Sequence, residues 1–421
     1  MLDGPRPTPL PGSVFRNRNY RFLWFGSVAS AFGSSIGGVV FTWVVFTATH
    51  SPLAIALLGV AGILPTVLFG ILAGGLIDRS ERRRLMILCD VARMVSLGAL
   101  ALYSLLFGVS VVAILAAVFL VATFSTIFRP ATNAVIPRLV GREQMTDANG
   151  LLMSGTTVAS FVGSPVGGLL VVAVGAGIGF AVNAVTFGFS AAMIALMVIP
   201  LLPTSHDAGP TAPSSFLSEV REGLSYIVSQ PALLYITTTA MAANFFLSIF
   251  GQFQVVYVAE RLHLGAASFG VLLAANAGGF GLGGLLAGRV GADRAPGLWF
   301  AAVWGASGFA VIGVALVTNL PLATLLTLAF GTLGGLGNTI FLSATQRIVP
   351  ARLLGRYFAT DEAGSFAMIP AGQIAGGFLI LAVGVASSFV IAGIGTVTVN
   401  IVLLASRSVR EWGRRPIPTP D

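Results

Sequence analysis

Two charged side chains inside an apolar stretch are the first candidates for chemistry in this sequence. Asp90 and Arg93 lie three residues apart within 85–107, a segment that carries no other charge. On a helix this spacing lets the carboxylate and the guanidinium pair. If the segment crosses a membrane, an unpaired charge there costs at least about 2.5–3.5 kcal/mol. Two interpretations stay open: a structural ion pair, or a site that couples proton transfer to another process.

A short charged stretch between two long apolar segments is the second candidate. It contains Gly74, Asp78, Arg79, Arg82 and Arg83. Arginines suit a loop at a membrane surface, where basic residues set orientation and acidic residues contribute little. Asp78 follows Gly74 by one helical turn, so it could pair with an arginine or a helix N-terminus in one conformation only. A gating role and a solvated turn are the two alternatives.

Neutral polar and aromatic side chains within the apolar segments could line a substrate cavity. Their alternative role is hydrogen bonding and packing between helices. Carboxylates that would bind a cation, or a sugar together with a proton, are scarce in these segments, so the pattern favours an uncharged or amphipathic substrate. The candidate cavity residues are Ser34, Phe41, Phe124, Phe128, Asn244, Gln252, Asn338 and Gln373.

The residue types that most enzymes need are absent or scattered. The three histidines do not cluster, and the sequence has no lysine, so it lacks the phosphate-binding loop of ATP-driven proteins. The single cysteine, Cys89, excludes an internal disulfide and a metal site built from several cysteines. We therefore expect no enzyme activity, no metal and no cofactor, and an ion gradient as the source of energy.

The composition indicates a polytopic membrane protein. Of 421 residues, 56% are hydrophobic and 9% are charged, with a mean hydropathy of +0.92. Ordinary soluble domains carry about 25% charged residues. All basic residues are arginines, and the net charge is +8. They lie in short loops and not in one patch, which argues against nucleic-acid binding.

The apolar segments are long and continuous, which is typical of membrane-spanning helices and not of outer-membrane barrels. A short amphipathic helix at 216–227 is expected on the membrane surface. Twelve spans are predicted over residues 20–47, 52–77, 85–107, 110–128, 149–174, 177–202, 231–258, 267–287, 298–317, 322–344, 365–383 and 387–405.

Arginine positions and an internal repeat organise these spans. All 23 arginines except Arg93 and Arg261 fall in the termini or in alternate loops, so the positive-inside rule places both termini in the cytoplasm. The tripeptide Leu-Ala-Gly at 72–74 recurs at 286–288, an offset of 214 residues. Two parallel repeats of six spans occur in some transporters. We predict an N-terminal bundle over 1–202, a cytoplasmic linker with the short surface helix over 203–230, and a C-terminal bundle over 231–421.

The charged stretch resembles the signature of the loop between spans 2 and 3 in the major facilitator superfamily. The matching residues are Gly74, Asp78, Arg79, Arg82 and Arg83. Glu81 stands where the family usually has Gly. The resemblance implies an all-α membrane fold with twelve transmembrane helices in two pseudo-symmetric bundles. It also implies that Asp78 and the following arginines form a cytoplasmic gate latch.

The fifth predicted span resembles the motif of proton-coupled antiporters in the same superfamily. The matching residues are Gly163, Pro165, Gly167 and Gly168. The match departs from the family at one point, because Ser164 stands where the family has its proline and Pro165 follows one place later. This resemblance implies exchange of a substrate against protons.

Shorter segments resemble the branch of siderophore (enterobactin-type) and macrolide exporters. They are Phe-Leu-Trp at 22–24, Ser-Pro-Leu-Ala at 51–54, Arg-Pro-Ala at 129–131 and Ile-Pro-Arg-Leu-Val at 136–140, together with Asp90 and Arg93. Many members of this branch have an acidic residue in span 1, where this chain has Ser34 and Ser35. A coupling site must then lie elsewhere here, and Asp90 with Arg93 is the first candidate.

These features together predict a secondary active transporter in the bacterial plasma membrane, a monomer whose partners are the lipid bilayer, a small-molecule substrate and a proton gradient. The resemblance favours a proton-coupled exporter of a small amphipathic compound (a drug, a siderophore or a natural product) that works by alternating access. An importer or facilitator of a small neutral solute is the alternative, and a transport-inactive sensor or assembly partner is a third. The sequence does not identify the substrate.

Overall fold

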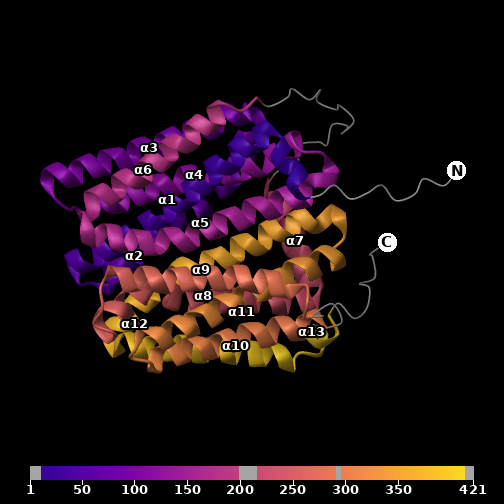
Figure 1. Cartoon of the computed structure of the whole chain (residues 1–421). Helices are drawn as coiled ribbons and strands as arrows, with labels where there is room; N and C mark the ends of the chain where they lie inside the picture. The colour runs from indigo at the N-terminus through magenta and orange to yellow at the C-terminus, as the bar shows by residue number, and fades with distance from the viewer. Residues whose placement is uncertain (1–10, 199–215, 291–294, 413–421) are drawn as a thin grey trace.

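Long apolar helices make up most of the molecule (Figure 1). The computed structural model describes residues 11–198, 216–290 and 295–412. Within these ranges there is no strand, and eleven helices are long and apolar enough to cross a membrane. The prediction of an all-α membrane protein is confirmed.

The helices lie at the following positions. The long ones are α1 (Arg18–Thr49), α2 (Pro52–Arg79), α3 (Arg82–Phe107), α4 (Val111–Leu139), α5 (Met145–Ala173), α6 (Gly175–Ala195), α8 (Pro231–Val256), α9 (Ala266–Ala287), α10 (Pro296–Leu316), α11 (Leu320–Ile348) and α12 (Ala351–Ala405). The short ones are η1 (Pro11–Arg16), η2 (Arg142–Gln144), α7 (Phe216–Ser229), η3 (Tyr257–Arg261) and α13 (Arg407–Glu411).

The twelve predicted spans correspond to eleven helical elements, and the difference lies in α12. This element is 55 residues long and contains both of the last two predicted spans. Its backbone is not helical at Gly384, where φ is 79° and ψ is 165°. Gly adopts such a φ without the steric cost that a side chain would add, so the chain changes direction there without a loop. One predicted span lies on each side of Gly384.

The predicted end of the fourth span is wrong. The sequence predicts a stop at 128, but α4 continues through Pro130 to Leu139. Ala131 and Val135 on the added turns are buried in the core. Their burial outweighs the backbone hydrogen bond that Pro130 removes.

The predicted start of the eleventh span is also wrong. The sequence predicts a loop before 365, but the helix already begins at Ala351. Leu353, Tyr357 and Asp361 follow one another at four-residue spacing on the added turns, and all three are buried. This segment is polar in sequence, but it forms a helix with one buried face.

At the sixth span, α6 ends at Ala195, and residues 199–202 lie outside the described residues.

The spanning helices run in alternate directions, so their connections gather at two ends of the molecule. We call the end that holds the start of α1 and the end of α12 the terminal end, and the opposite end the far end.

Side-chain caps begin several helices. Asn17 accepts a hydrogen bond from the Asn19 backbone N–H at 2.9 Å at the start of α1. At the far end Asn319 accepts from the Leu322 N–H at 3.0 Å and starts α11.

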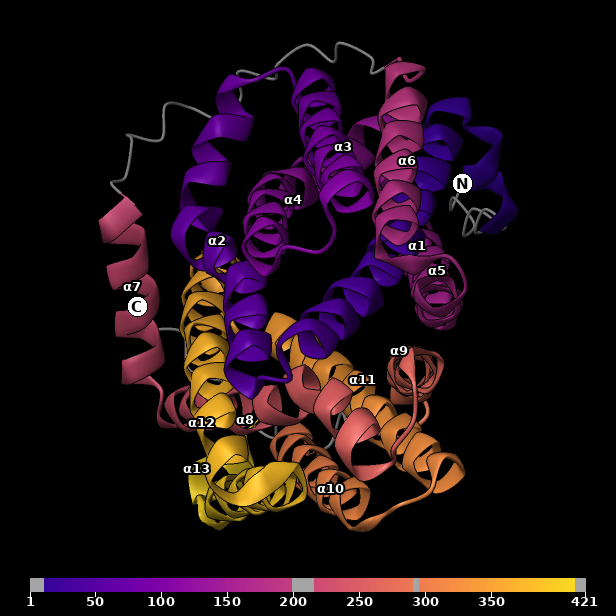
Figure 2. The same ribbon diagram turned by 90° about the vertical axis from the view of Figure 1, so that its left-hand side faces the viewer.

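The helices form two groups that lie side by side (Figures 1 and 2). In the N-terminal half, α1 packs against α5 and α6, and α3 packs against α4 and α6. In the C-terminal half, α8 packs against α12, α9 against α11, and α10 against α11 and α12. The two halves meet mainly where α5 contacts α9 and where α2 contacts α12.

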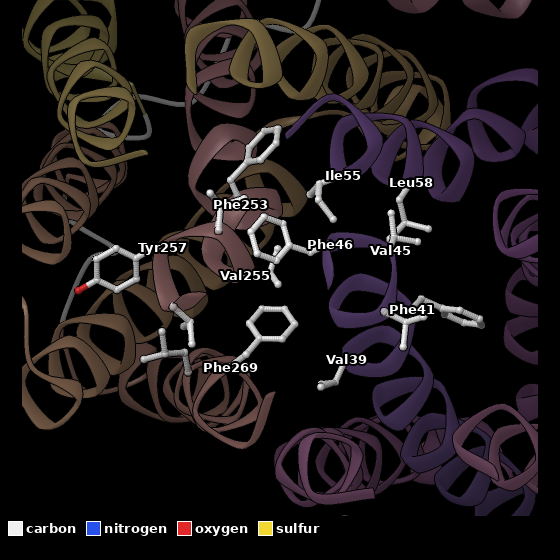
Figure 3. Close-up of a cluster of buried hydrophobic side chains, with 14 of the residues drawn as sticks. Val39, Phe41, Val45, Phe46, Ile55, Leu58, Phe253, Val255, Tyr257 and Phe269 are labelled. Carbon is white, nitrogen blue, oxygen red and sulfur yellow. The ribbon is translucent and has the colours of Figure 1, made fainter. Parts of the chain in front are cut away.

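Among the residues that the structure describes, one cluster of buried apolar side chains joins the two halves, and it lies at the far end. This cluster, which we call the shared core, contains Phe46 and Ile55 of the N-terminal half together with Phe253 and Phe269 of the C-terminal half (Figure 3). At the terminal end there are two clusters among the described residues, and each contains residues of one half. The halves are therefore sealed together by apolar packing at the far end.

Large apolar side chains are exposed on the outside of both halves. Phe107, Val112 and Leu316 are 75%, 77% and 69% exposed. Soluble proteins avoid extended exposed apolar surface. Lipid chains would cover these side chains, and the helices satisfy their own backbone hydrogen bonds, as a bilayer requires.

Candidate transport sites

The buried ion pair of Asp90 and Arg93 lies inside the N-terminal half. Arg93 donates a hydrogen bond to Asp90, and the two side chains are 5% and 0% exposed. The guanidinium lies between two aromatic rings, 4.2 Å from the centroid of Phe128 and 4.4 Å from that of Phe187. It also donates to the Ser125 hydroxyl at 3.4 Å. The charge of Arg93 is thus compensated by a carboxylate and by two ring faces.

Two arginines of the charged stretch bind the ends of neighbouring helices. Arg82 donates to the carbonyl oxygen of Ala134 in α4 at 3.2 Å. Arg83 donates to the carbonyl oxygens of Ile194, at 3.2 Å, and of Ala195, both at the end of α6. Positive charge near a helix C-terminus is favourable because it interacts with the partial negative charge of the helix dipole there. Both arginines therefore hold helices of the N-terminal half together.

The remaining residues of the predicted latch belong to the last turns of α2. The α2 backbone is helical through Gly74 and Asp78 to Arg79. Their side chains lie outside the described residues, and the latch contacts of Asp78 stay a prediction.

The glycines of the span 5 motif hold α5 between two neighbours. An added methyl group at Gly163 would lie 2.7 Å from the carbonyl oxygen of Phe32, and one at Gly167 would lie 2.8 Å from that of Ile36, both in α1. At Gly168 it would overlap the carbonyl oxygen of Ala266 in α9. Small residues permit such close backbone approach. The motif thus packs α5 against its own half on one side and against the opposite half on the other.

The contact between α5 and α9 is reciprocal. An added methyl group at Gly270 of α9 would overlap the carbonyl oxygen of Ser164, and it would lie 3.0 Å from the Cα atom of Pro165. About halfway along both helices a cavity of about 380 Å3 is lined by the hydroxyl residues Thr156, Thr157 and Ser160 of α5 and by Asn276 of α9.

Two predicted cavity residues instead connect the halves at the far end. Gln252 of α8 donates a hydrogen bond to the carbonyl oxygen of Ile55 in α2 at 2.7 Å. Gln373 of α12 donates to the side-chain oxygen of Gln252 at 3.4 Å. Gly59 leaves room for both, since a methyl group there would lie 2.6 Å from Gln252 and 2.7 Å from Gln373. These amides add a polar contact beside the shared core.

A cavity of about 390 Å3 lies within the C-terminal half, between α8, α10, α11 and α12. Its volume is within the range of about 300–1,000 Å3 that is common for small-molecule sites. Its polar lining includes Asn244 and Asn338, two of the eight predicted cavity residues. Its aromatic lining consists of Phe300, Trp304, Phe341, Phe358 and Phe366. We call this space the C-terminal cavity.

The other predicted cavity residues lie elsewhere. Phe41 stacks on Phe180 with ring centroids 5.0 Å apart, and Phe128 covers Arg93. Phe124 packs beside the terminal-end cluster of the N-terminal half. Ser34 is exposed on α1. None of these side chains lines either of the two cavities described here.

Asp361 lines the C-terminal cavity and was not among the predicted residues. It is 8% exposed and accepts a hydrogen bond from the Thr237 hydroxyl at 2.7 Å. The prediction missed it because 345–364 reads as a polar cytoplasmic loop. The spacing of Phe358, Asp361 and Ser365, which share one helix face and all line the cavity, is the signal that could have found it.

Curated relatives cover nearly the whole chain. The multidrug efflux pump Tap of Mycolicibacterium fortuitum is 25% identical over 398 residues, which is 92% of this chain and 96% of the relative. The enterobactin exporter EntS of Citrobacter koseri is 27% identical over 382 residues, 89% of this chain and 88% of the relative.

Solved structures of similar fold include two kinds of transporter. A bacterial homologue of the human lysosomal transporter Spinster has a TM-score of 0.69 and 16% identity, with 98% of both chains covered. A POT family peptide transporter has a TM-score of 0.71 and 14% identity, with 92% of this chain and 95% of the other covered. At this level of identity the similarity supports the fold alone.

A family assignment completes these comparisons. The sequence profile described as "Transmembrane secretion effector" matches residues 10–416, nearly the full length. The similar proteins named above are transporters and not enzymes. The chain is therefore a multi-pass membrane transporter that belongs to the transmembrane secretion effector family of the major facilitator superfamily.

Proposed function

We propose that this transporter is a proton-coupled exporter of a small amphipathic compound that works by alternating access. The single observation that carries the proposal is the unequal packing of the two ends. The halves share an apolar core at the far end, whereas the two terminal-end clusters of the described residues each belong to a separate half. Such an arrangement suits a state closed on one side of the membrane.

The moving units in this proposal are residues 1–202 and 231–421, joined by 203–230. The basic loops lie at the terminal end, so we place that end and both termini in the cytoplasm. The far end then faces outward, and the described state is closed to the outside. A substrate would enter from the cytoplasm or the inner leaflet and leave after the halves rock apart at the far end.

Export is the direction that the names of the relatives support. Tap is named a multidrug efflux pump, and EntS is named an enterobactin exporter. An amphipathic substrate suits the cavity between α5 and α9, because hydroxyl groups and the Asn276 amide lie there beside the apolar side chains of Leu273 and Phe280.

Proton coupling is supported by the antiporter-type residues Gly163, Pro165, Gly167 and Gly168. We propose that Gly168 acts at the moving interface, because it faces α9 of the other half. The pair of Asp90 and Arg93 stays a candidate coupling site. Its complete burial and its aromatic enclosure favour a structural role.

The test uses the purified full chain in proteoliposomes with a fluorescent amphipathic dye. Chains oriented with the terminal end outward should accumulate dye when the lumen is acidic, and nigericin, which dissipates the pH gradient, should abolish the accumulation. Equal dye equilibration with and without the gradient would identify a facilitator. Absence of counterflow with a broad panel of amphipathic compounds would overturn the proposal.

A further inference from the structure

The two halves touch along two helix pairs that the internal repeat relates to each other. α5 packs against α9 on one side of the molecule, and α2 packs against α12 on the other (Figure 2). With the offset of 214 residues, the start of α9 at Ala266 corresponds to the start of α2 at Pro52. By the same offset, Gly270 of α9 corresponds to Ala56 of α2. The two pairs are therefore equivalent contacts, and their side chains can be compared.

Close packing and burial fix the register of α5 relative to α12. An added methyl group at Gly270 would overlap the carbonyl oxygen of Ser164. Its counterpart Ala56 has its Cβ atom 3.2 Å from a methyl group added at Gly377 of α12. Ser164 and Gly377 therefore hold the same place in the two contacts, at an offset of 213 residues. The pattern of burial agrees with this offset, since the buried Ala159, Gly163 and Ser164 correspond to the buried Gly372, Gly376 and Gly377.

Two glutamines bridge the halves beside the contact between α2 and α12. Gln373 donates a hydrogen bond to the side-chain oxygen of Gln252 at 3.4 Å. Gln252 in turn donates to the carbonyl oxygen of Ile55 at 2.7 Å. Both amides belong to the C-terminal half, and the carbonyl oxygen belongs to the N-terminal half. An internal amide group thus links the two halves on this side of the molecule.

Both glutamines have small counterparts beside the contact between α5 and α9. At the offset of 213 residues, Ser160 of α5 takes the place of Gln373. At the offset of 214 residues, Gly38 of α1 takes the place of Gln252, and the pattern Ser-x-x-Gly at 34–37 recurs at that offset. Gly38 is exposed, and no described atom of another helix lies within 4 Å of a methyl group added there. On this side, neither position carries a side chain that could bridge the halves.

The cavity of about 380 Å3 between α5 and α9 lies where this bridge is missing. Thr157 and Ser160 line it from the N-terminal half, and Asn276 lines it from the C-terminal half. Within the described part of the chain, these three side chains make no hydrogen bond with another residue. Hydroxyl and amide groups can both donate and accept. The cavity therefore offers hydrogen-bonding groups from both halves to a ligand.

The described lining of this cavity has no ionisable side chain. Its other members are Thr156, Leu273, Ala277 and Phe280. Burying a charge without a partner costs far more than burying a neutral group that is hydrogen-bonded. Leu273 and the ring of Phe280 offer apolar contact to the body of an amphipathic molecule. The lining therefore favours an uncharged group with donor and acceptor atoms, attached to an apolar body.

We infer that this cavity binds an uncharged amide group of the transported compound, which bridges Ser160 and Asn276 as the internal amide bridges the halves on the other side. The inference rests on the proposed function, in that it names the substrate class of the proposed transporter. The cavity lies about halfway along α5 and α9, and one wall belongs to each half. Rocking of the halves would therefore separate the two walls and release the amide.

The test compares three naphthalene probes of similar size: the uncharged naphthaleneacetamide, the anion naphthaleneacetate and the cation naphthylethylammonium. Binding is measured by equilibrium titration of the full chain in lipid nanodiscs, with empty nanodiscs as the blank. The wild type should bind the amide at least about tenfold more tightly than either ion, because the cavity holds no counter-charge for an ion.

The internal repeat supplies the sharpest variant. Ser160→Gln places an amide side chain where α12 has Gln373, and by filling the cavity it should weaken binding of the amide probe at least about tenfold. Ser154→Gln is a control of the same size, since Ser154 is exposed on α5 and does not line the cavity; it should bind like the wild type. Asn276→Leu conserves volume and should weaken binding about 2- to 12-fold by loss of a hydrogen bond, which gives a second test if Ser160→Gln does not fold.

Two outcomes would overturn the inference: no preference for the amide over the ions in the wild type, or wild-type amide affinity in every folded variant of Ser160 and Asn276. Dye counterflow in proteoliposomes separates this failure from failure of the proposed function. Counterflow by a chain without amide preference would remove the amide site and keep the transporter. Absence of counterflow would remove the proposed function, whatever the binding measurements show.

Discussion

Replacing Gly168 with Ala should change the balance between conformations and leave the fold intact. Gly168 faces the opposite half, where an added methyl group would overlap the carbonyl oxygen of Ala266. In the proposed mechanism this contact exists only while the halves are closed at the far end. Overpacking a close contact costs about 1–3 kcal/mol. The equilibrium should therefore move away from the far-end-closed state by about 5- to 150-fold.

Two other glycines of α5 provide matched controls. Gly167 faces α1 of its own half, where a methyl group would lie 2.8 Å from the carbonyl oxygen of Ile36. Gly167→Ala should therefore lower the melting temperature without changing the conformational balance. Gly150 has no neighbour within 4 Å of an added methyl group. Gly150→Ala should leave the conformational balance unchanged, and its gain in helix propensity of about 1 kcal/mol should raise the melting temperature slightly.

The assay measures distances between spin labels at the far end by electron–electron double resonance. Labels on cysteines at Ala48 and Leu264, both exposed, report on the N-terminal and C-terminal halves. The native Cys89 is buried and is replaced by Ser. Gly168→Ala should enlarge the long-distance population relative to the wild type and Gly150→Ala. An unchanged distance distribution with a lower melting temperature would refute the reasoning, since Gly168 would then serve static packing.

Three further predictions concern single polar side chains. Asp78→Asn should reduce transport in proteoliposomes without loss of expression or folding, and wild-type turnover would exclude the latch. Asp90→Asn leaves Arg93 buried without its carboxylate and should lower the free energy of unfolding by about 3–5 kcal/mol. Transport by the protein that does fold should keep its dependence on the pH gradient. Loss of that dependence would show that Asp90 couples transport to protons. Gln252→Leu removes the hydrogen bond to the carbonyl oxygen of Ile55 and should raise the far-end-open population about 2- to 12-fold, by the same label distances; no change would show that this bond does not stabilise the closed state.

The membrane class and the number of long apolar segments follow from the sequence because a bilayer imposes one length and one polarity on every span. The prediction missed two details of where the helices continue. Gly384 joins two predicted spans into one helical element, because glycine permits the sharp change of direction there. Pro130 lies inside a helix that was expected to stop before it, because the residues after it are buried against neighbouring helices.

The candidate site was predicted only in part. Asn244 and Asn338 lie in the same cavity, as expected for polar residues in spans, but Gln252 and Gln373 connect the halves instead. A polar residue in an apolar helix must find a hydrogen-bonding partner, and the sequence does not show which helix supplies it. Asp361 was missed because its helix extends beyond the apolar segment.

The sequence by itself determined that this chain is a helical membrane transporter with two related halves. Those properties depend on composition, on the spacing of arginines and on motifs that are local in the chain. Only the tertiary structure decided that Gly168 contacts the opposite half while Gly167 contacts its own. It also decided that two glutamines bridge the halves on one side, whereas Ser160 and Asn276 line a cavity between the halves on the other. The physical reason is that adjacent residues on a helix point 100° apart, so the partner of each depends on how the helices pack.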